Sequence, residues 1–315
     1  MKASRRSNTV VVIPCFRVSA KILDVLSNIP SDVSKIIVID DKCPEKTGQI
    51  VKKSKFGKKV TVITNATNLG VGGAMKIGYI EAMRTKPDVV IKVDGDGQMN
   101  PKDIPKFISA IMEKEYDYAK GNRFFSVENL SQMPLVRKIG NLALSFMSKL
   151  STGYYEIFDP NNGFTAISGP CLTQIPLNKI NDRYFFESDM LFQLNLLGAK
   201  VIDISLPAIY NGENSSLRIG HSLVTFPKNH LRNLVKRITY TYYLRDFNIA
   251  SIQLFLGSIL LSWGTYFGVY TWLHSMSNNV ATAPGTIVLV AILIIVGLQL
   301  LLSFLSFDMR SQKRE

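Results

Sequence analysis

Two aspartates, Asp94 and Asp96, stand one residue apart at the end of an apolar run, in the stretch IKVDGDGQMNP at residues 91–101. In an extended segment the side chains at i and i+2 point to the same side, so the two carboxylates share one side of the strand end. Carboxylates this close repel each other unless a cation lies near them. One or two carboxylates, together with substrate phosphates, are what holds Mg²⁺ or Mn²⁺, and Gln98 can add an amide oxygen. The pattern predicts a Mg²⁺ or Mn²⁺ site at Asp94, Asp96 and Gln98, with a solvated acidic turn as the alternative.

The elements that position this pair are short strands alternating with helices. Strands are predicted from β-branched runs, and helices from the longer mixed segments between them. The strands are expected at 9–14, 35–40, 59–64 and 88–94, and the helices near 18–28, 44–54, 71–84 and 103–114. This alternation predicts an α/β domain with a mostly parallel sheet covered on both faces. Ligands bind beyond the carboxyl ends of such strands, where Pro14, Asp40, Asp41, Asp94 and Asp96 all fall, and this favours the metal site over the acidic turn.

A glycine-rich stretch, NLGVGGAM at residues 68–75, follows the third predicted strand. The dinucleotide fingerprint G-x-G-x-x-G fails here because position 75 is Met, and because the fingerprint follows the first strand of its fold. We interpret the stretch as a flexible or closely packed helix start near a nucleotide, with Gly72 as a nucleotide-binding residue.

The composition indicates a folded protein with an anionic partner. The chain has 315 residues, of which 46% are hydrophobic and 19% charged, and its formal net charge is +13. Such a surplus indicates nucleic acid, a phosphorylated substrate or lipid headgroups. The three cysteines are odd in number and form no CxxC pair, so neither a disulfide framework nor a zinc site is expected.

Two long stretches near the C-terminus, 249–273 and 285–307, contain no charged residue. At about 1.5 Å per residue, either helix can cross a hydrocarbon core about 30 Å thick, and a pair of buried soluble helices is the alternative. The connection between them lacks Lys and Arg, whereas both outer flanks are basic. The positive-inside rule therefore predicts a multi-pass protein of the cytoplasmic membrane, with the α/β domain and both termini in the cytoplasm.

Residues 228–246 are expected to form an amphipathic helix in the headgroup layer of an anionic membrane, with a solvated helix packed on the soluble domain as the alternative. Apolar side chains recur on one side of this helix: Leu231, Leu234, Val235, Ile238 and Tyr242. The predicted parts of the chain are an α/β domain (1–227), a juxtamembrane helix region (228–248), two transmembrane helices (249–307) and a cytoplasmic tail (308–315).

Seven motifs in order resemble the inverting glycosyltransferases of family 2, which have the GT-A fold, and more closely their polyprenyl-phosphate (dolichol- or undecaprenyl-phosphate) branch. The motifs are VVVIPCF, IIVIDD, NLGVGGAMKIGY, KVDGDGQMNP, GNRF, DPNNGFTAIS and FESDML. One departure is that Lys42 and Cys43 stand where the family has a Gly-Ser-like pair after the paired aspartates.

The resemblance implies roles for single residues. In the donor half, Pro14 with Asp40 or Asp41 would line the base and ribose of a nucleotide sugar, and Asp94 would lie near the ribose and sugar. Asp96 and Gln98 would hold the metal on the diphosphate. Glu187 and Asp189 would lie near the donor sugar.

In the acceptor half, the resemblance places Asp159 at the reacting centre, and three arginines would meet the lipid phosphate: Arg123, Arg137 and Arg218. A phosphate monoester has a second pKa of about 6, so this acceptor is already ionised at neutral pH. Asp159 is therefore expected to orient groups or act electrostatically, and less to serve as an obligate base.

The function implied is transfer of one sugar, with inversion, from a UDP-, GDP- or dTDP-sugar to a membrane polyprenyl phosphate. No nucleic-acid partner is expected, and a homo-oligomer is left open. A processive polysaccharide synthase is one alternative, but it would need a Q-x-x-R-W motif and more spans, and Gln193 is followed by LNLL. A non-catalytic membrane scaffold is the other alternative, and the intact Asp94, Asp96, Asp159 and Arg123 disfavour it.

Overall fold

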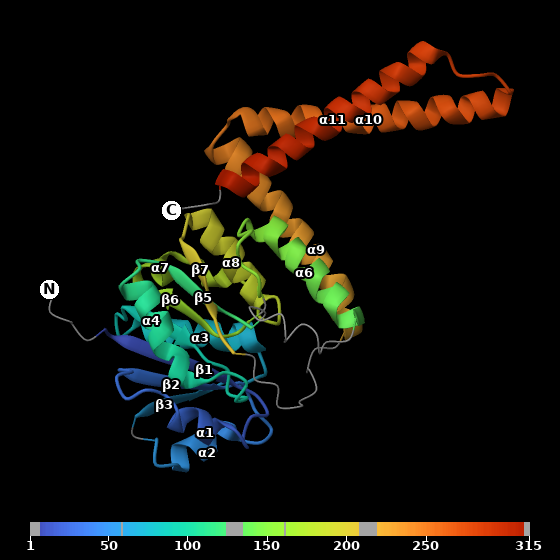
Figure 1. Cartoon of the computed structure of the whole chain (residues 1–315). Coiled ribbons are helices and arrows are strands. Elements are labelled where there is room, and N and C mark those ends of the chain that lie inside the picture. Colours follow the sequence, from blue (N-terminus) through green and yellow to red (C-terminus); the bar gives the residue numbers. More distant parts are fainter. Residues whose placement is uncertain (1–6, 58, 124–134, 161, 208–218, 312–315) are drawn as a thin grey trace. The chain divides into compact units, whose positions relative to one another are not determined.

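The computed structural model describes residues 7–57, 59–123, 135–160, 162–207 and 219–311 (Figure 1). The chain forms two compact units, Met1–Leu234 and Val235–Glu315. The boundary lies seven residues after the end of the predicted α/β domain at 227.

The first unit is built on a mixed seven-stranded sheet of order β3-β2-β1-β4-β6-β5-β7. Its strands are β1 (Thr9–Cys15), β2 (Lys35–Asp40), β3 (Val60–Thr64), β4 (Val89–Lys92), β5 (Tyr118–Asn122), β6 (Thr165–Ser168) and β7 (Val201–Ser205). β6 runs antiparallel to both of its neighbours, β4 and β5, and the other pairs are parallel. The predicted α/β class with a mostly parallel sheet is confirmed.

Helices cover both faces of this sheet, which explains why its central strands are apolar at nearly every position. Along β1, Val10 and Val12 pack with α3 (Val71–Met83), α7 (Gly169–Gln174) and α8 (Phe186–Leu197). Val11 and Ile13 face the opposite side, which is covered by α1 (Ile22–Ser27), α2 (Thr47–Lys53) and α4 (Ile104–Met112). A 3₁₀ turn, Pro101–Asp103, precedes α4, and a second one, Leu177–Lys179, follows α7. The four helices predicted in the first 120 residues are present, each somewhat shorter than its expected range.

Two further helices complete this unit. α6 (Leu135–Thr152) follows β5, and α9 (Ile219–Thr239) begins here and continues past the unit boundary. The two helices are joined by a buried hydrogen bond between Ser151 Oγ and His230 Nδ1 at 2.7 Å. α9 begins well before the predicted residue 228, and it exposes Leu231 and Val235 while it buries His230 and Asn233. The exposed apolar residues are typical of a helix at a membrane surface, and the location of this segment in the headgroup layer stays a prediction.

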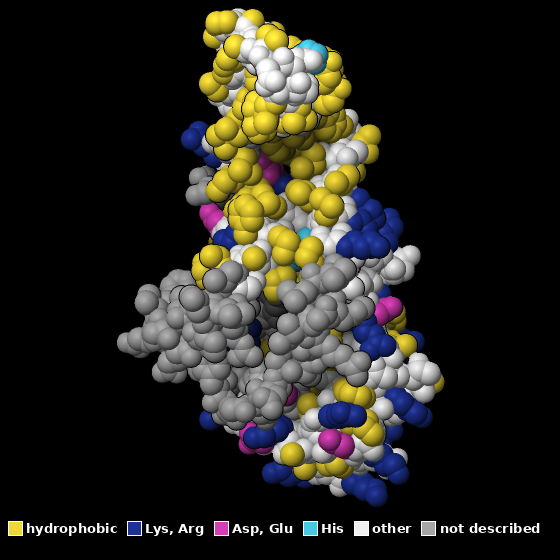
Figure 2. Space-filling model, turned by 90° about the vertical axis from the view of Figure 1, so that its right-hand side faces the viewer, with side chains coloured by type: hydrophobic (Ala, Val, Ile, Leu, Met, Phe, Trp, Pro, Cys, Tyr) yellow, Lys and Arg dark blue, Asp and Glu magenta, His cyan; other side chains and the backbone are white. Residues whose placement is uncertain are grey.

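The second unit contains two helices long and apolar enough to cross a membrane, α10 (Ile249–Asn278) and α11 (Pro284–Ser311). They extend beyond the predicted spans, and hydrophobic side chains cover the visible face of this hairpin (Figure 2). Glycine allows the two backbones to approach closely, because a Cβ added at Gly297 would lie 2.6 Å from the backbone nitrogen of Leu261. These helices indicate that the chain associates with a membrane.

A buried ion pair joins the end of α9 to the end of α11 inside the second unit. Arg237 donates from Nη1 and Nη2 to the two carboxylate oxygens of Asp308, each at 2.7 Å, and Tyr242 Oη donates to Asp308 Oδ1 at 2.7 Å. Tyr242 lies in a π-helical turn, Tyr240–Arg245, that follows α9. The predicted helix at 228–246 is therefore an α-helix that ends in a π turn.

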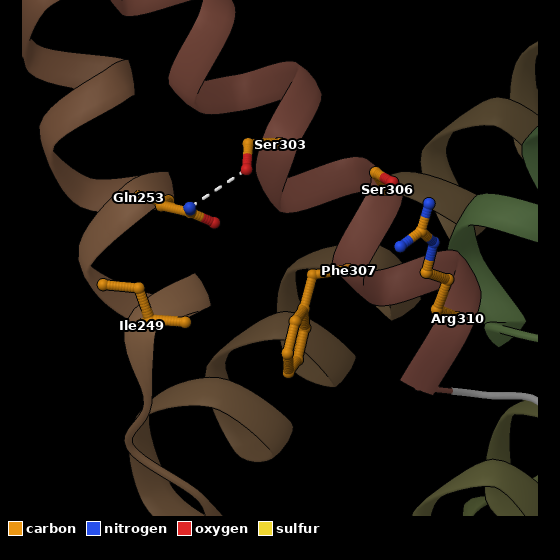
Figure 3. Close-up of a pocket in the computed structure, with 6 residues that line it drawn as sticks. All are labelled: Ile249, Gln253, Ser303, Ser306, Phe307 and Arg310. Atoms are coloured by element: carbon orange, nitrogen blue, oxygen red, sulfur yellow. Dashed lines mark hydrogen bonds between the residues drawn. The ribbon is translucent and has the colours of Figure 1, made fainter.

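The hairpin also carries a shallow cavity of about 290 Å³ beside the C-terminal turns of α11 (Figure 3). It is lined by Ile249, Gln253, Ser303, Ser306, Phe307 and Arg310. A hydrogen bond of 3.0 Å from Gln253 Nε2 to Ser303 Oγ crosses between the helices at this point.

Candidate active site

The predicted donor-binding residues lie where the parallel strands β1, β2 and β4 end. Pro14 is half-buried in β1, opposite Ile39 of β2. Asp40, the last residue of β2, is buried, and its two oxygens accept from the backbone nitrogens of Cys43 and Gly48, each at 2.7 Å. Asp40 therefore shapes the loop after β2. Its contact with a base or ribose stays a prediction.

Asp41 fixes the glycine-rich segment that the sequence analysis singled out. Its Oδ1 accepts from Leu69 N at 2.9 Å and its Oδ2 from Gly70 N at 2.7 Å. The start of α3 then packs closely on another segment, since a Cβ at Gly72 would lie 2.2 Å from the backbone oxygen of Asn181. Close packing thus requires glycine at position 72, whereas the contact of Gly72 with a nucleotide stays a prediction.

A buried lysine holds Asp94 and Glu187 together. Lys92 Nζ lies 2.8 Å from Asp94 Oδ1 and 3.2 Å from Glu187 Oε1, although the two carboxylates come from β4's end and from α8. Both acids were predicted from the sequence as site residues, whereas Lys92 was not. The sequence feature that could have identified Lys92 is a charged residue inside the apolar run VVIKV. A strand that is buried on both faces has no solvent for an ammonium group, so such a lysine needs partners within the protein.

Asp96 lies beyond this cluster, in a tight turn. Its Oδ1 accepts from the backbone nitrogen of Gln98 at 3.0 Å, and Gly97 between them has φ of 75°. Among the described residues, no group of three His, Cys, Asp or Glu side chains is arranged to hold a metal by itself. A single half-buried carboxylate instead fits a divalent cation that takes its other ligands from a diphosphate and water, and the part of the Gln98 amide stays a prediction.

The acceptor half of the predicted site brings Arg123 and Asp159 together. Arg123 Nε donates to Asp159 Oδ2 at 2.9 Å, and Asn162 Nδ2 donates to the same oxygen at 3.2 Å. The Asp159 side chain is 3% exposed and that of Arg123 40% exposed. A buried carboxylate thus holds a guanidinium group whose side chain is partly exposed.

Two titratable residues that were not predicted contact neighbours of this pair. Burial lowers the pKa of Lys120 to about 8, and its ammonium donates to the backbone oxygen of Asn162. Burial raises the pKa of Asp203 to about 6, and its Oδ2 accepts from Asn122 Nδ2 at 2.9 Å. Both residues lie on strands, β5 and β7, and for Asp203 the sequence signal is again a charged side chain in an apolar run, VIDIS.

Three further predicted residues are not brought into these clusters by the described contacts. Asp189 is buried in α8 and accepts from Asn181 N at 2.9 Å and from Asn233 Nδ2 of α9 at 2.6 Å. Its described contacts are with the protein, and its contact with the donor sugar stays a prediction. Arg137 lies in α6, with no side-chain description, and Arg218 lies outside the described residues.

Known proteins show the same fold and related sequences. An uncharacterized protein of Methanocaldococcus jannaschii is 32% identical over 229 residues, 72% of this chain and 91% of that protein. The UDP-N-acetylglucosamine–dolichyl-phosphate N-acetylglucosaminyltransferase of Methanococcus voltae is 29% identical over 214 residues, 64% of this chain and 85% of that enzyme.

Solved structures share the fold. Glucosyl-3-phosphoglycerate synthase from Mycobacterium tuberculosis, solved with Mn²⁺, UDP-glucose and phosphoglyceric acid, aligns with a TM-score of 0.54 and 18% identity, over 73% of this chain and 79% of that one. The predicted GT-A fold is thereby confirmed. The family model of glycosyl transferase family 2 matches residues 10–174, more than half of the chain, so the protein belongs to this family and is a glycosyltransferase.

Proposed function

We propose that this glycosyltransferase transfers one sugar from a nucleotide-sugar donor to a membrane polyprenyl phosphate, with inversion at the sugar. The observation that carries the proposal is that the family 2 domain is followed in the same chain by two helices long and apolar enough to cross a membrane. A water-soluble acceptor would need neither helix. The relative in Methanococcus voltae is named for a dolichyl-phosphate acceptor, which supports the same class of substrate.

The donor half would use the acids at the strand ends. Asp96 and Gln98 would hold Mg²⁺ or Mn²⁺, which offsets the negative charge of the leaving diphosphate. The solved neighbour with Mn²⁺ and UDP-glucose supports a divalent cation in this fold. Asp94 and Glu187, held by Lys92, would face the ribose and the sugar. Asp40, Asp41 and Pro14 would shape the nucleotide pocket.

The acceptor half would depend on positioning more than on proton transfer. The phosphate of the lipid has a second pKa of about 6, so it is ionised at pH 7 and needs no strong base. Arg123, oriented by Asp159, would hold this anion in place against the negative charge of the donor. Asp159 is therefore a positioning residue in this mechanism.

We further propose that the chain lies in the cytoplasmic membrane with its catalytic unit and both termini in the cytoplasm. Support comes from the basic flanks of the two spans and from the apolar residues that α9 exposes, Leu231 and Val235. The polyprenyl phosphate would then reach the site from the cytoplasmic leaflet.

The test uses the full chain in lipid nanodiscs that contain a polyprenyl phosphate. A panel of UDP-, GDP- and dTDP-sugars with Mg²⁺ or Mn²⁺ is screened, and lipid products are identified by mass spectrometry. We expect one donor to give a lipid that carries a single sugar through a phosphodiester, with inverted anomeric configuration. A sugar chain on the lipid would favour the processive synthase, and a lack of product with every donor and lipid would favour the scaffold.

A further inference from the structure

Lys92 is a buried cation placed between two acids of the donor half. Its side chain is 1% exposed, whereas those of Asp94 and Glu187 are 27% and 9% exposed. The ammonium therefore lies behind the carboxylates, and Asp94 is the most open of the three side chains. A lysine in this position cannot reach bulk solvent, so it acts through the two acids.

Burying a charged lysine at this position of β4 costs free energy, and this cost indicates that the lysine has a function. Its neighbours on β4 are Val89, Val90 and Ile91, and an apolar residue at 92 would avoid the desolvation of an ammonium group. The cost of burial is offset by two opposite charges at hydrogen-bond distance. The structure thus fixes the oxygens that Lys92 contacts, Asp94 Oδ1 and Glu187 Oε1.

The second oxygen of Asp94 is confined as well. A Cβ added at Gly163 would lie 2.2 Å from Asp94 Oδ2 and 2.5 Å from Lys92 Nζ, so the backbone at Gly163 packs directly against the ion pair. The backbone nitrogen of Asp94 lies 3.4 Å from Met99 Sδ. Asp94 is held by a cation on one oxygen and approached by backbone at the other, whereas Asp96 lies in a turn with Gln98.

We propose that Lys92 is a positioning residue that serves as an internal counter-cation: it holds Asp94 and Glu187 toward the donor sugar and keeps Asp94 from binding the divalent cation, which is left to Asp96 and Gln98. The inference rests on the proposed donor site. It makes the two aspartates of the DGD motif unequal, since Lys92 Nζ already lies 2.8 Å from Asp94 Oδ1.

The charge balance gives the measurable consequence. Lys92, Asp94 and Glu187 together carry one net negative charge, and removal of the lysine charge leaves two. Because the charge of the ligands sets the affinity of a carboxylate site for hard cations, Lys92→Met should bind Mn²⁺ more tightly. Lys92→Arg keeps the charge and serves as the matched control.

The experiment titrates Mn²⁺ alone, without nucleotide, into the full chain in detergent, with unbound Mn²⁺ followed by electron paramagnetic resonance. We expect Lys92→Met to bind Mn²⁺ at least about fivefold more tightly than the wild type, and Lys92→Met/Asp94→Asn to return to the wild-type affinity. Asp94→Asn alone should change the affinity by less than about twofold, whereas Asp96→Asn should weaken it about tenfold or more. An unchanged affinity in folded Lys92→Met, or equal losses in Asp94→Asn and Asp96→Asn, would overturn the proposal.

A second pair of variants keeps the test valid if Lys92→Met does not fold. Glu187→Gln and Lys92→Met/Glu187→Gln differ only at residue 92. The double variant removes the lysine from one carboxylate, Asp94, whereas Lys92→Met alone removes it from two. The double variant should still bind Mn²⁺ more tightly than Glu187→Gln, because replacing Lys92 by Met removes the cation that pairs with Asp94. Equal affinities in this pair would contradict the role of Lys92.

Kinetics separate positioning from a merely structural role. Lys92→Met should raise the KM for the nucleotide sugar about fivefold or more and change the KM for the lipid by less than about twofold, since its partners face the donor. Equal increases in both KM values would count against the proposal. Failure of the polyprenyl-phosphate assay would overturn the proposed acceptor, yet it would leave the Mn²⁺ titrations interpretable.

Discussion

Arg123 donates to both carboxylate oxygens of Asp159, at 2.9 Å from Nε to Oδ2 and at 3.4 Å from Nη2 to Oδ1. The pair joins the segment after β5 to the DPNNGF segment, which are 36 residues apart in the chain. The carboxylate fixes the plane of the guanidinium group, and the exposed part of that group can meet a phosphate.

The first prediction concerns this pair. Arg123→Ala should raise the KM for polyprenyl phosphate about ten- to a hundredfold, because hydrogen bonds to charged groups contribute about 1.5–3 kcal/mol. The KM for the nucleotide sugar should stay near the wild-type value. Steady-state kinetics in nanodiscs with varied lipid and varied donor provide the measurement. Arg84→Ala, at an exposed arginine of the first unit, is the control, and a defect of Arg123→Ala confined to the donor would contradict the assignment.

The second prediction concerns the metal. Asp96→Asn keeps the shape of the turn but removes a charge, so turnover should fall about a hundredfold or more, which corresponds to the loss of several kcal/mol of transition-state stabilisation. EDTA should have the same effect on the wild type, and added Mg²⁺ or Mn²⁺ should restore it. The exposed Asp24 in α1 provides a matched control as Asp24→Asn. Normal turnover of both Asp96→Asn and the chelated enzyme would refute the metal site.

The third prediction is a pH dependence of stability. Burial lowers the pKa of His230 from 6.5 to about 4, so the folded unit holds this imidazole neutral while the unfolded chain protonates it below pH 6.5. The stabilisation is therefore fully present above pH 6.5 and is lost as the pH falls toward 4, by at most about 3 kcal/mol. Thermal unfolding between pH 7.5 and 4.5 measures this loss.

His230→Gln should flatten this pH profile, because the glutamine does not titrate and can still contact Ser151 Oγ. His274→Gln, at an exposed position after the aromatic residues of α10, should leave the profile unchanged. If wild type and His230→Gln lose stability in parallel as the pH falls, His230 is not the group responsible.

The fourth prediction concerns the ion pair of the second unit. Asp308→Asn removes the carboxylate charge that lies 2.7 Å from the buried Arg237, and loss of one member of a buried pair costs about 3–5 kcal/mol. Asp246→Asn is the matched control, since Asp246 pairs with Arg245 at 3.2 Å but is 62% exposed, and such a pair contributes about 0–1 kcal/mol. Thermal unfolding in detergent should show a large loss for the first variant and little for the second. Equal losses would mean that the ion pair does not stabilise the hairpin.

The fifth prediction tests topology by thiol labelling. Cysteine placed at Ser277 should react with a membrane-impermeant maleimide from outside the cell, and cysteine at Ser311 only after the cytoplasmic side is opened. The three native cysteines, Cys15, Cys43 and Cys171, are buried and provide a low background. Labelling of both positions from the same side would refute the hairpin orientation.

Much of the fold could be predicted because the signals are local. Four β-branched runs predicted β1 to β4, and the DGD motif falls just after β4, as expected. The antiparallel strand β6 could not be predicted in its place between β4 and β5, because the order of strands depends on packing across the whole sheet. The family and the GT-A fold were predicted from ordered motifs, and both are confirmed.

The contacts within the site could not be predicted. Lys92 and Glu187 are 95 residues apart, and only the crossing of β4 and α8 makes them partners. Asp40 and Asp41 were predicted as ligand contacts, yet their described hydrogen bonds run to Cys43, Gly48 and the glycine-rich segment. A carboxylate near a strand end can bind a ligand or shape a loop, and the sequence is the same in both cases.

The ion pair between Arg237 and Asp308 has a consequence for the preparation of a shortened protein. A fragment cut just before α10 would keep Arg237 and lose Asp308, so the buried ion pair that joins α9 to α11 could not form. A fragment that stops at Leu234, where the first compact unit ends, would carry neither member of the pair. The sound place to cut for crystallisation therefore lies inside α9, although the obvious place in the sequence is the start of the first apolar stretch.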